Sequence, residues 1–192
     1  MTIPKSRCPW CLSHAIYIDY HDKEWGRTLH EDRKLFEFLI LDGAQAGLSW
    51  LTVLKKRVNY RRAFDDFDAE KIARYDSKKV KSLLADAGII RNRLKIASAI
   101  DNAKAYLKIR KEQGSFDKYL WSFVGGKTIV NHPKTMKDIP TRSANSDAMS
   151  ADLKRRGFRF VGTTICYAFM QAAGMVDDHL VDCFRRKKTK RP

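Results

Sequence analysis

Two pairs of residues that could bind a metal ion lie near opposite ends of the chain. Cys8 and Cys11 stand in a Cys-Pro-Trp-Cys segment that His21 follows, and His179 and Cys183 are four residues apart near the C-terminus. On a helix, that separation places two ligands on one face. A structural zinc site takes four nitrogen or sulfur ligands, so the pairs predict one zinc site that joins both ends, with Cys11 or His21 among its ligands. Unrelated thiols and surface histidines are the other interpretation.

Residues 41–57 form a second group, in which an acid, two glycines, a leucine and a tryptophan precede a basic run. Asp42 and the aromatic ring could hold a nucleobase, and Lys55 could bind a phosphate. Gly47 gives the backbone the freedom to approach DNA closely, and Leu48 could fill the gap that an extruded nucleotide leaves. The alternative is an amphipathic helix with packed apolar residues and solvated lysines.

Aromatic residues are concentrated around the first metal-ligand pair. The group comprises Trp10, Tyr17, Tyr20, Trp25 and Trp50. Aromatic pockets hold bases that have been taken out of the DNA stack, whereas core packing is the commoner fate of any single aromatic residue. Because four of the five alternate with the N-terminal candidate ligands, a metal there would also shape the wall of such a pocket.

A basic helical hairpin is expected around residues 83–93. One helix should stop at Gly88, the chain should turn through Ile89, and a second helix should start with Arg91 and Arg93. Backbone N–H groups at such a turn suit a phosphate oxygen. The alternative is an ordinary helical hairpin with a glycine cap.

The elements that must position these residues are helices, because helical periodicity predominates and strand-like alternation is almost absent. The predicted helices span residues 32–46, 49–64, 77–87, 91–113, 116–123, 146–156 and 163–173. Ser77 and Ser146 are expected to cap two of them, and the apolar segment 163–173 to be the central buried helix. Residues 125–145 are rich in turn formers and predict a long connection. The predicted fold class is all-α.

Size and charge indicate the kind of partner. A chain of 192 residues fits one domain, predicted here as residues 1–184, or two small lobes with the pocket between them. The formal charge of +16 favours polyanions, of which nucleic acid is the commonest. Residues 185–192 form a basic block that should be a disordered tail. No apolar run approaches a membrane span or a signal peptide, so we expect no membrane association and a cytoplasmic protein with thiols rather than disulfides.

Together these segments closely resemble the 3-methyladenine DNA glycosylase I family, helix-hairpin-helix enzymes that excise alkylated adenine from DNA. The matching motifs are Cys8-x-Trp10, Tyr17-x-x-Tyr20-His21-Asp22-x-Glu24-Trp25-Gly26, Gln45-Ala46-Gly47-Leu48-Ser49-Trp50, Val53-Leu54-Lys55-Lys56-Arg57, Ala87-Gly88-Ile89-Ile90-Arg91, Trp121-Ser122-Phe123-Val124, Arg156-Gly157-Phe158-Arg159-Phe160-Val161-Gly162-Thr163-Thr164-Ile165-Cys166-Tyr167 and Asp178-His179. They span nearly the whole chain except the tail.

The resemblance implies an all-helical glycosylase with one structural zinc bound by Cys8, His21, His179 and Cys183. It implies a base pocket of Tyr17, Tyr20 and Trp50, with Trp10 and Trp25 close by. The DNA contacts expected from the residues themselves are Gly47, Leu48, Lys55, Gly88, Ile89, Arg91 and Arg93. The expected partner is double-stranded DNA containing alkylated adenine, bound by a monomer at the nucleoid.

Position 42 departs from the family pattern. The family has glutamate there as the acid that recognises the base, whereas this chain has Asp42, one methylene shorter, and Ala44 replaces a residue that is often glutamine. We expect Asp42 to act in excising 3-methyladenine by hydrolysis of its N-glycosidic bond. The alternative function is a zinc-containing protein that binds DNA lesions without catalysis.

Overall fold

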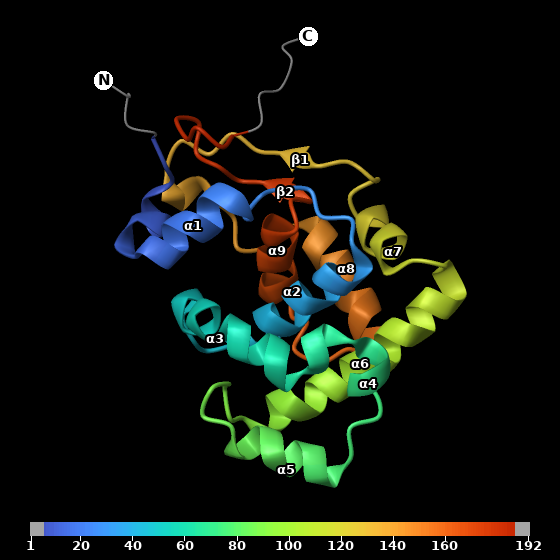
Figure 1. Cartoon of the computed structure of the whole chain (residues 1–192). Coiled ribbons are helices and arrows are strands. Elements are labelled where there is room, and N and C mark those ends of the chain that lie inside the picture. Colours follow the sequence, from blue (N-terminus) through green and yellow to red (C-terminus); the bar gives the residue numbers. More distant parts are fainter. Residues whose placement is uncertain (1–5, 187–192) are drawn as a thin grey trace.

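The computed structural model describes residues 6–186 and is built almost entirely of helices (Figure 1). The helices are α1 (Ala15–Lys23), α2 (Asp32–Gln45), α3 (Trp50–Ala63), α4 (Ala69–Ile72), α5 (Ser77–Ala85), α6 (Arg93–Gln113), α7 (Phe116–Ser122), α8 (Ala144–Arg155) and α9 (Thr163–Ala172). Short 3-10 turns are η1 (Pro9–Ser13), η2 (Asp65–Phe67) and η3 (Met136–Asp138), and the strands are β1 (Ile129–Val130) and β2 (Val176–Asp177). The predicted helical fold is confirmed.

Helix α2 is the central element, because it packs against α3, α6, α7 and α9 (Figure 1). Every residue from Leu35 to Ala44 is buried, including two acids. The apolar helix α9 was expected to take this central place, but it is buried mainly on one side. On its other side Ala168 and Gln171 line a cavity. The buried apolar side chains form one cluster that extends from Cys8 to Cys183.

Capping residues set the helix boundaries, and two differ from the prediction. Ser143, and not Ser146, caps α8, and the Ser146 side chain bonds back to the backbone N–H of Ser143 as a capping box. Asp76, and not Ser77, caps α5 by accepting from the N–H of Lys79. The larger errors of the prediction concern helices α1 and α4, which were not predicted. Both are too short to show a long helical periodicity.

The C-terminal part of the described chain returns to its N-terminal part. Strands β1 and β2 pair in parallel, with Ile129 opposite Val176, and hold the 125–145 connection against the end of α9 (Figure 1). The N–H of Phe184 then donates to the carbonyl of Ser6 at 3.0 Å. Of the predicted disordered tail, residues 185–186 are placed, and residues 187–192 lie outside the described part of the chain.

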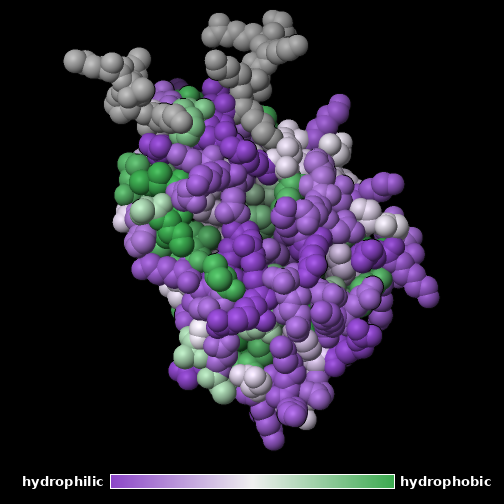
Figure 2. Space-filling view, in the orientation of Figure 1, coloured by the Kyte–Doolittle hydropathy of each residue, from purple (hydrophilic) through white to green (hydrophobic). Residues whose placement is uncertain are grey.

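The face shown in Figure 2 is mostly hydrophilic, with a group of hydrophobic residues beside α1 and α3. Leu48 is one of the large apolar side chains that remain exposed, at 41%. Among the described residues, every helix is too short or too polar to cross a membrane.

Candidate functional site

A cavity of about 240 Å³ opens between α1, α2, α3 and α9. Its lining is largely apolar and comprises Trp10, Tyr20, Trp25, Asp42, Gln45, Trp50, Met136, Ile139, Ala168, Gln171 and Ala172. Four of the five aromatic residues predicted from the sequence therefore line one cavity, together with the predicted acid. An apolar pocket with a few polar groups is the usual form of a small-molecule site.

The aromatic walls of the cavity come from three separate segments that pack edge to face. Trp10 in η1 and Trp25 after α1 have ring centroids 5.1 Å apart, and the rings of Tyr20 and Trp50 are 5.6 Å apart. Such tilted contacts are the favoured geometry between aromatic rings. They hold the rings around a space where a flat, electron-poor ring could bind against aromatic faces.

Tyr17, expected in the pocket, does not line the cavity. Its hydroxyl accepts a hydrogen bond from the N–H of Leu51 at 2.8 Å, and its ring meets Trp10 edge-on at 5.6 Å. The N–H groups in the first turn of a helix have no acceptor within the helix, and the Tyr17 hydroxyl supplies an acceptor for the first turn of α3. Its place in this structure is therefore behind the pocket wall, where it fixes the start of α3 and with it Trp50.

Asp42 is the acid of the cavity and is only 3% exposed. Its Oδ2 atom is buried and makes no hydrogen bond with any described residue. Burial raises the pKa of Asp42 well above the usual carboxyl range, and the positive charge of Arg57 opposes this only in part. The site therefore holds a buried carboxyl oxygen without a hydrogen-bond partner among the described residues, in a group whose neutral form is favoured unless a positive charge comes close.

Arg57 joins the three helices that carry the polar and aromatic walls. Its Nε donates to Glu37 of α2 at 2.7 Å, and its Nη1 donates to Glu24 at the end of α1 at 2.6 Å. The guanidinium also lies over the ring of Phe38 at 5.0 Å. The Arg57–Glu37 pair is largely shielded from water, whereas the Glu24 side chain is 39% exposed, and together the two pairs fix α3 relative to α1 and α2.

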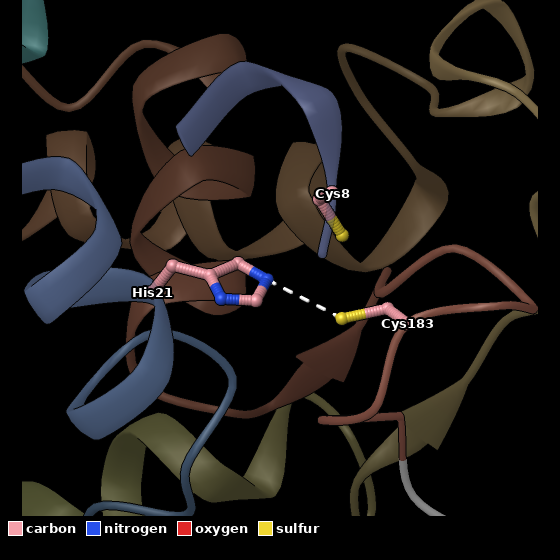
Figure 3. Close-up of side chains that lie close together, drawn as sticks. All are labelled: Cys8, His21 and Cys183. Atoms are coloured by element: carbon pink, nitrogen blue, oxygen red, sulfur yellow. Dashed lines mark hydrogen bonds between the residues drawn. The ribbon is translucent and has the colours of Figure 1, made fainter. Parts of the chain in front are cut away.

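Three of the four predicted metal ligands meet beside the cavity (Figure 3). The ligand atoms of Cys8, His21 and Cys183 all lie within 4.8 Å of one another, and the three residues are buried. His21 Nε2 is 3.4 Å from Cys183 Sγ. Cys11, the alternative ligand, instead donates its thiol to the carbonyl of Cys8. Geometry therefore favours His21 over Cys11.

His179 lies next to this group, with its ring centroid 5.1 Å from that of His21. Its Nδ1 is 2.7 Å from Asp177 Oδ1, and the Nδ1 of His21 is 2.8 Å from Asp22 Oδ1. The buried Nε2 of His179 makes no hydrogen bond with a described residue. Histidines that bind metals through one nitrogen commonly donate the other N–H to a carboxylate, as both rings are placed to do.

The charge state of Cys183 also suits a metal. Hydrogen bonds from Cys8 and His21 lower the pKa of Cys183 below the usual thiol range despite burial, while the same pairing raises the pKa of Cys8. A thiolate is the form that binds metal. The expected helical spacing from His179 to Cys183 is wrong, however, because both residues lie in the irregular segment after β2.

The Cys/His group and the cavity share a wall. The His179 ring lies 4.5 Å from Trp25, and the His21 ring lies 5.6 Å from Trp10. Both tryptophans face the cavity on their other side. A shift of either histidine would therefore move a ring of the pocket, as the alternation of these residues along the sequence suggested.

Most residues expected to contact DNA are exposed. Leu48, Lys55, Arg91 and Arg93 are exposed, and Gly47 adopts a φ of +75°, which favours glycine. These side chains are thus available to a large polyanion.

The turn between α5 and α6 differs from the expectation. Ile89 is only 2% exposed, and an added Cβ at Gly88 would lie 2.8 Å from Asp86 Oδ1. The N–H of Gly88 donates to Asp86 Oδ1, that of Ile89 to Asp86 O, and that of Ile90 to Tyr60. These three amides were expected to point outward to phosphate, but they hold the turn together instead. Packing explains both Gly88 and Ile89 here.

Comparison with known proteins shows the family to which a chain with this cavity and Cys/His group belongs. The family model for methyladenine glycosylase matches residues 10–186. The chain belongs to the methyladenine glycosylase family. It is 51% identical over 178 residues to DNA-3-methyladenine glycosylase of Haemophilus influenzae, an alignment that covers 93% of this chain and 96% of the relative.

Solved structures of the methyladenine glycosylase family agree with this fold. A crystal structure of 3-methyladenine DNA glycosylase I matches with a TM-score of 0.93 at 49% identity, over 95% of this chain and all of the other. A Staphylococcus aureus structure described as the structural basis of 3-methyladenine recognition matches with a TM-score of 0.92 at 38% identity, over 96% and 98% of the two chains. The family predicted from the sequence motifs is confirmed.

Several pocket residues of this methyladenine glycosylase were missed by sequence reasoning. Gln45 lies three residues after Asp42 on the same face of α2, so helical spacing could have identified it. Gln171 is held by donating to Asp178 at 2.7 Å, a contact that no local pattern signals. Met136 and Ile139 come from the 125–145 connection, whose course depends on the β1–β2 pair.

Proposed function

We propose that this protein excises 3-methyladenine from alkylated double-stranded DNA and leaves an abasic site. One observation supports this most directly: in a chain of the methyladenine glycosylase family, Asp42 presents an unpaired carboxyl oxygen among aromatic rings. The relatives named above carry this activity in their names, and family membership confirms the predicted enzyme class. A DNA repair enzyme of this kind would act at the nucleoid.

The proposed chemistry follows from the substrate's charge. Methylation at N3 makes adenine cationic, so it leaves with the electron pair of the bond between N9 and C1′ and needs little acid catalysis. Water then bonds to C1′ and loses a proton, which completes the hydrolysis. The faces of Tyr20 and Trp50 favour a cationic ring over a neutral one.

Asp42 is assigned to base recognition. A cation beside a buried carboxyl group favours its ionised form, so binding of the methylated base would lower the raised pKa of Asp42. The carboxylate would then accept a hydrogen bond from the exocyclic amino group of the base. Neutral adenine has no positive charge that could stabilise a buried carboxylate. The burial of Asp42 therefore favours binding of the methylated base over binding of neutral adenine.

We also propose one structural zinc ion, held by Cys8, His21, His179 and Cys183. The support is the donor set, the two carboxylates behind the histidines and the buried Nε2 of His179. Four protein ligands fill a tetrahedral site and leave no position for a reacting water, so the ion would supply stability and not chemistry.

DNA contacts are assigned to exposed residues of the segment before α3, of α3 itself and of the α5–α6 turn. Leu48, supported by Gly47, would fill the space left by the extruded nucleotide, and Arg91, Arg93 and Lys55 would neutralise phosphates. The helix-hairpin-helix assignment of α5 and α6 rests on this proposed role. The charge of +16 supports a DNA partner, and we expect a monomer to suffice, since the cavity is built within one chain.

Release of free base from methylated DNA tests the proposal. DNA treated with a methylating agent is incubated with protein, and the soluble fraction is separated by chromatography. We expect free 3-methyladenine with the wild type and with Glu70→Gln, an exposed carboxylate control, and a large loss with Asp42→Asn. Tight binding of methylated DNA without released base would instead support the non-catalytic lesion binder. Full activity of Asp42→Asn would refute the role of the acid.

A further inference from the structure

Lys95 makes two partly buried contacts that none of the roles above explains. Its Nζ donates to the carbonyl of Ala44 at 2.8 Å and to that of Ala46 at 2.7 Å. These are among the last carbonyls of α2, which lack partners within the helix and carry partial negative charge. Lys95 itself lies in the first turn of α6, where the helix dipole disfavours a positive charge. The favourable interactions of the Lys95 ammonium group are therefore those with the carbonyls at the end of α2, and its own helix opposes the charge.

The segment that Lys95 fixes leads directly to Leu48. After Ala46 the chain turns through Gly47, whose φ is +75°, and the N–H of Leu48 donates to the carbonyl of Gln45 at 2.6 Å. Ser49 then caps α3. Since so few residues separate Lys95's acceptors from Leu48, the lysine sets the direction in which Leu48 leaves the protein surface.

A second set of contacts joins α3, the helix after Leu48, to the turn between α5 and α6 (Figure 1). Lys56 Nζ donates to the carbonyl of Ala87 at 2.7 Å, and Tyr60 accepts from the N–H of Ile90 at 3.3 Å. The turn is thus bonded to the helix that follows Leu48, and the helix after the turn is bonded to the segment before Leu48. The two surface segments are linked on both sides.

We propose that Lys95 is a positioning residue for base extrusion, which makes the Leu48 segment and the α5–α6 hairpin move as one unit on DNA. The inference rests on the proposed function. Binding of phosphates by the hairpin would then place Leu48 in the duplex without a separate ordering step. Lys95 itself touches neither base nor phosphate in this account.

The test compares Lys95→Met with Lys108→Met, which removes the same charge from an exposed site on the same helix. Methionine retains the packing of the lysine stem and loses both hydrogen bonds. Three quantities are measured below the melting temperature of the least stable variant: excision rate on methylated duplex at saturating protein, affinity for free 3-methyladenine, and affinity for unmodified duplex. Hydrogen exchange of residues 44–50 reports the local order.

We expect Lys95→Met to slow excision about 10- to 100-fold, the cost of a misplaced group near the reaction, while both affinities stay close to wild type. Exchange should rise in residues 44–50 only. A rate equal to that of Lys108→Met would overturn the proposal, and so would a parallel loss of free-base affinity, because Lys95 would then act on the pocket. If the wild type releases no base in the same assay, the proposed function itself fails.

Discussion

Gly26 provides the sharpest test of the link between the Cys/His group and the fold. Its φ is +73°, and a Cβ added there would lie 2.5 Å from Cε1 and 3.0 Å from Nδ1 of His179. The glycine cannot retreat easily, because its N–H donates to the carbonyl of Gln171 at 3.1 Å. Gly26→Ala should therefore push the His179 ring out of its position against Trp25.

A matched control separates this clash from backbone strain. Gly114 has a φ of +77°, and within the described chain an added Cβ would meet no atom closer than 4 Å. Both alanine variants incur the left-handed penalty of about 1–2 kcal/mol. Only Gly26→Ala adds the cost of overpacking, about 1–3 kcal/mol. For a chain of this size each kcal/mol corresponds to about 2–4 °C, so the clash alone should make Gly26→Ala melt about 2–12 °C below Gly114→Ala, and any loss of bound zinc would lower its melting temperature further.

Two measurements on the same preparations decide the matter. Calorimetry gives the melting temperatures, and mass spectrometry of the metal gives zinc per chain. We expect about one zinc per chain in the wild type and Gly114→Ala, and clearly less in Gly26→Ala, since a tetrahedral site would lose a ligand. Equal melting temperatures and equal zinc in the two variants would refute both the contact with His179 and its role as a ligand.

Three further predictions concern the acid, the buried ion pairs and the metal. Because its pKa is raised, Asp42 retains in the folded state a proton that the unfolded chain releases above about pH 4, so stability should fall as pH rises from there. Asp42→Asn should weaken this dependence and be more stable than wild type at pH 7, and parallel melting curves from pH 4 to 8 would contradict this. Arg57→Met leaves the buried Glu37 with the partly exposed Arg61 as its remaining partner and should lower the free energy of unfolding by about 1–3 kcal/mol in urea titrations, whereas an unchanged free energy would show that the pair is not effectively buried. A strong chelator should lower the melting temperature by about 8–16 °C if the wild type holds zinc at about 1,000 times its dissociation constant, and an unchanged temperature would exclude a stabilising metal.

Local sequence signals predicted those parts of the site that lie close together along the chain. Asp42 near the end of α2 and Trp50 at the start of α3 stand in one short stretch of sequence, so their joint presence in a pocket followed from the pattern. The long helices α2, α3 and α6 were likewise predicted, with ends within two residues of those observed. In these cases local chemistry and tertiary packing favour the same structure.

Residues whose role depends on distant packing could not be predicted in the same way. Gln171 faces the cavity because Asp178 holds it, and Met136 reaches the cavity because β1 pairs with β2. His179 and Cys183 were paired as ligands because of their helical spacing, and that reason does not hold, since no helix joins them. Tyr17 shows the converse, because its motif marks it as functional while its contacts place it behind the pocket wall.

Three departures from the usual rules of folding lie at the cavity or next to it. Asp42 buries one carboxyl oxygen without a hydrogen-bond partner among the described residues, His179 does the same with a ring nitrogen, and Leu48 leaves an apolar side chain in water. Each departure costs folding free energy, and each would be relieved by a different ligand: a cationic base, a metal ion or a DNA stack. Because Trp25 connects His179 to the cavity and α2 connects Asp42 to the Leu48 segment, the three costs belong to one site. A fold selected for stability alone would have paired or removed these groups.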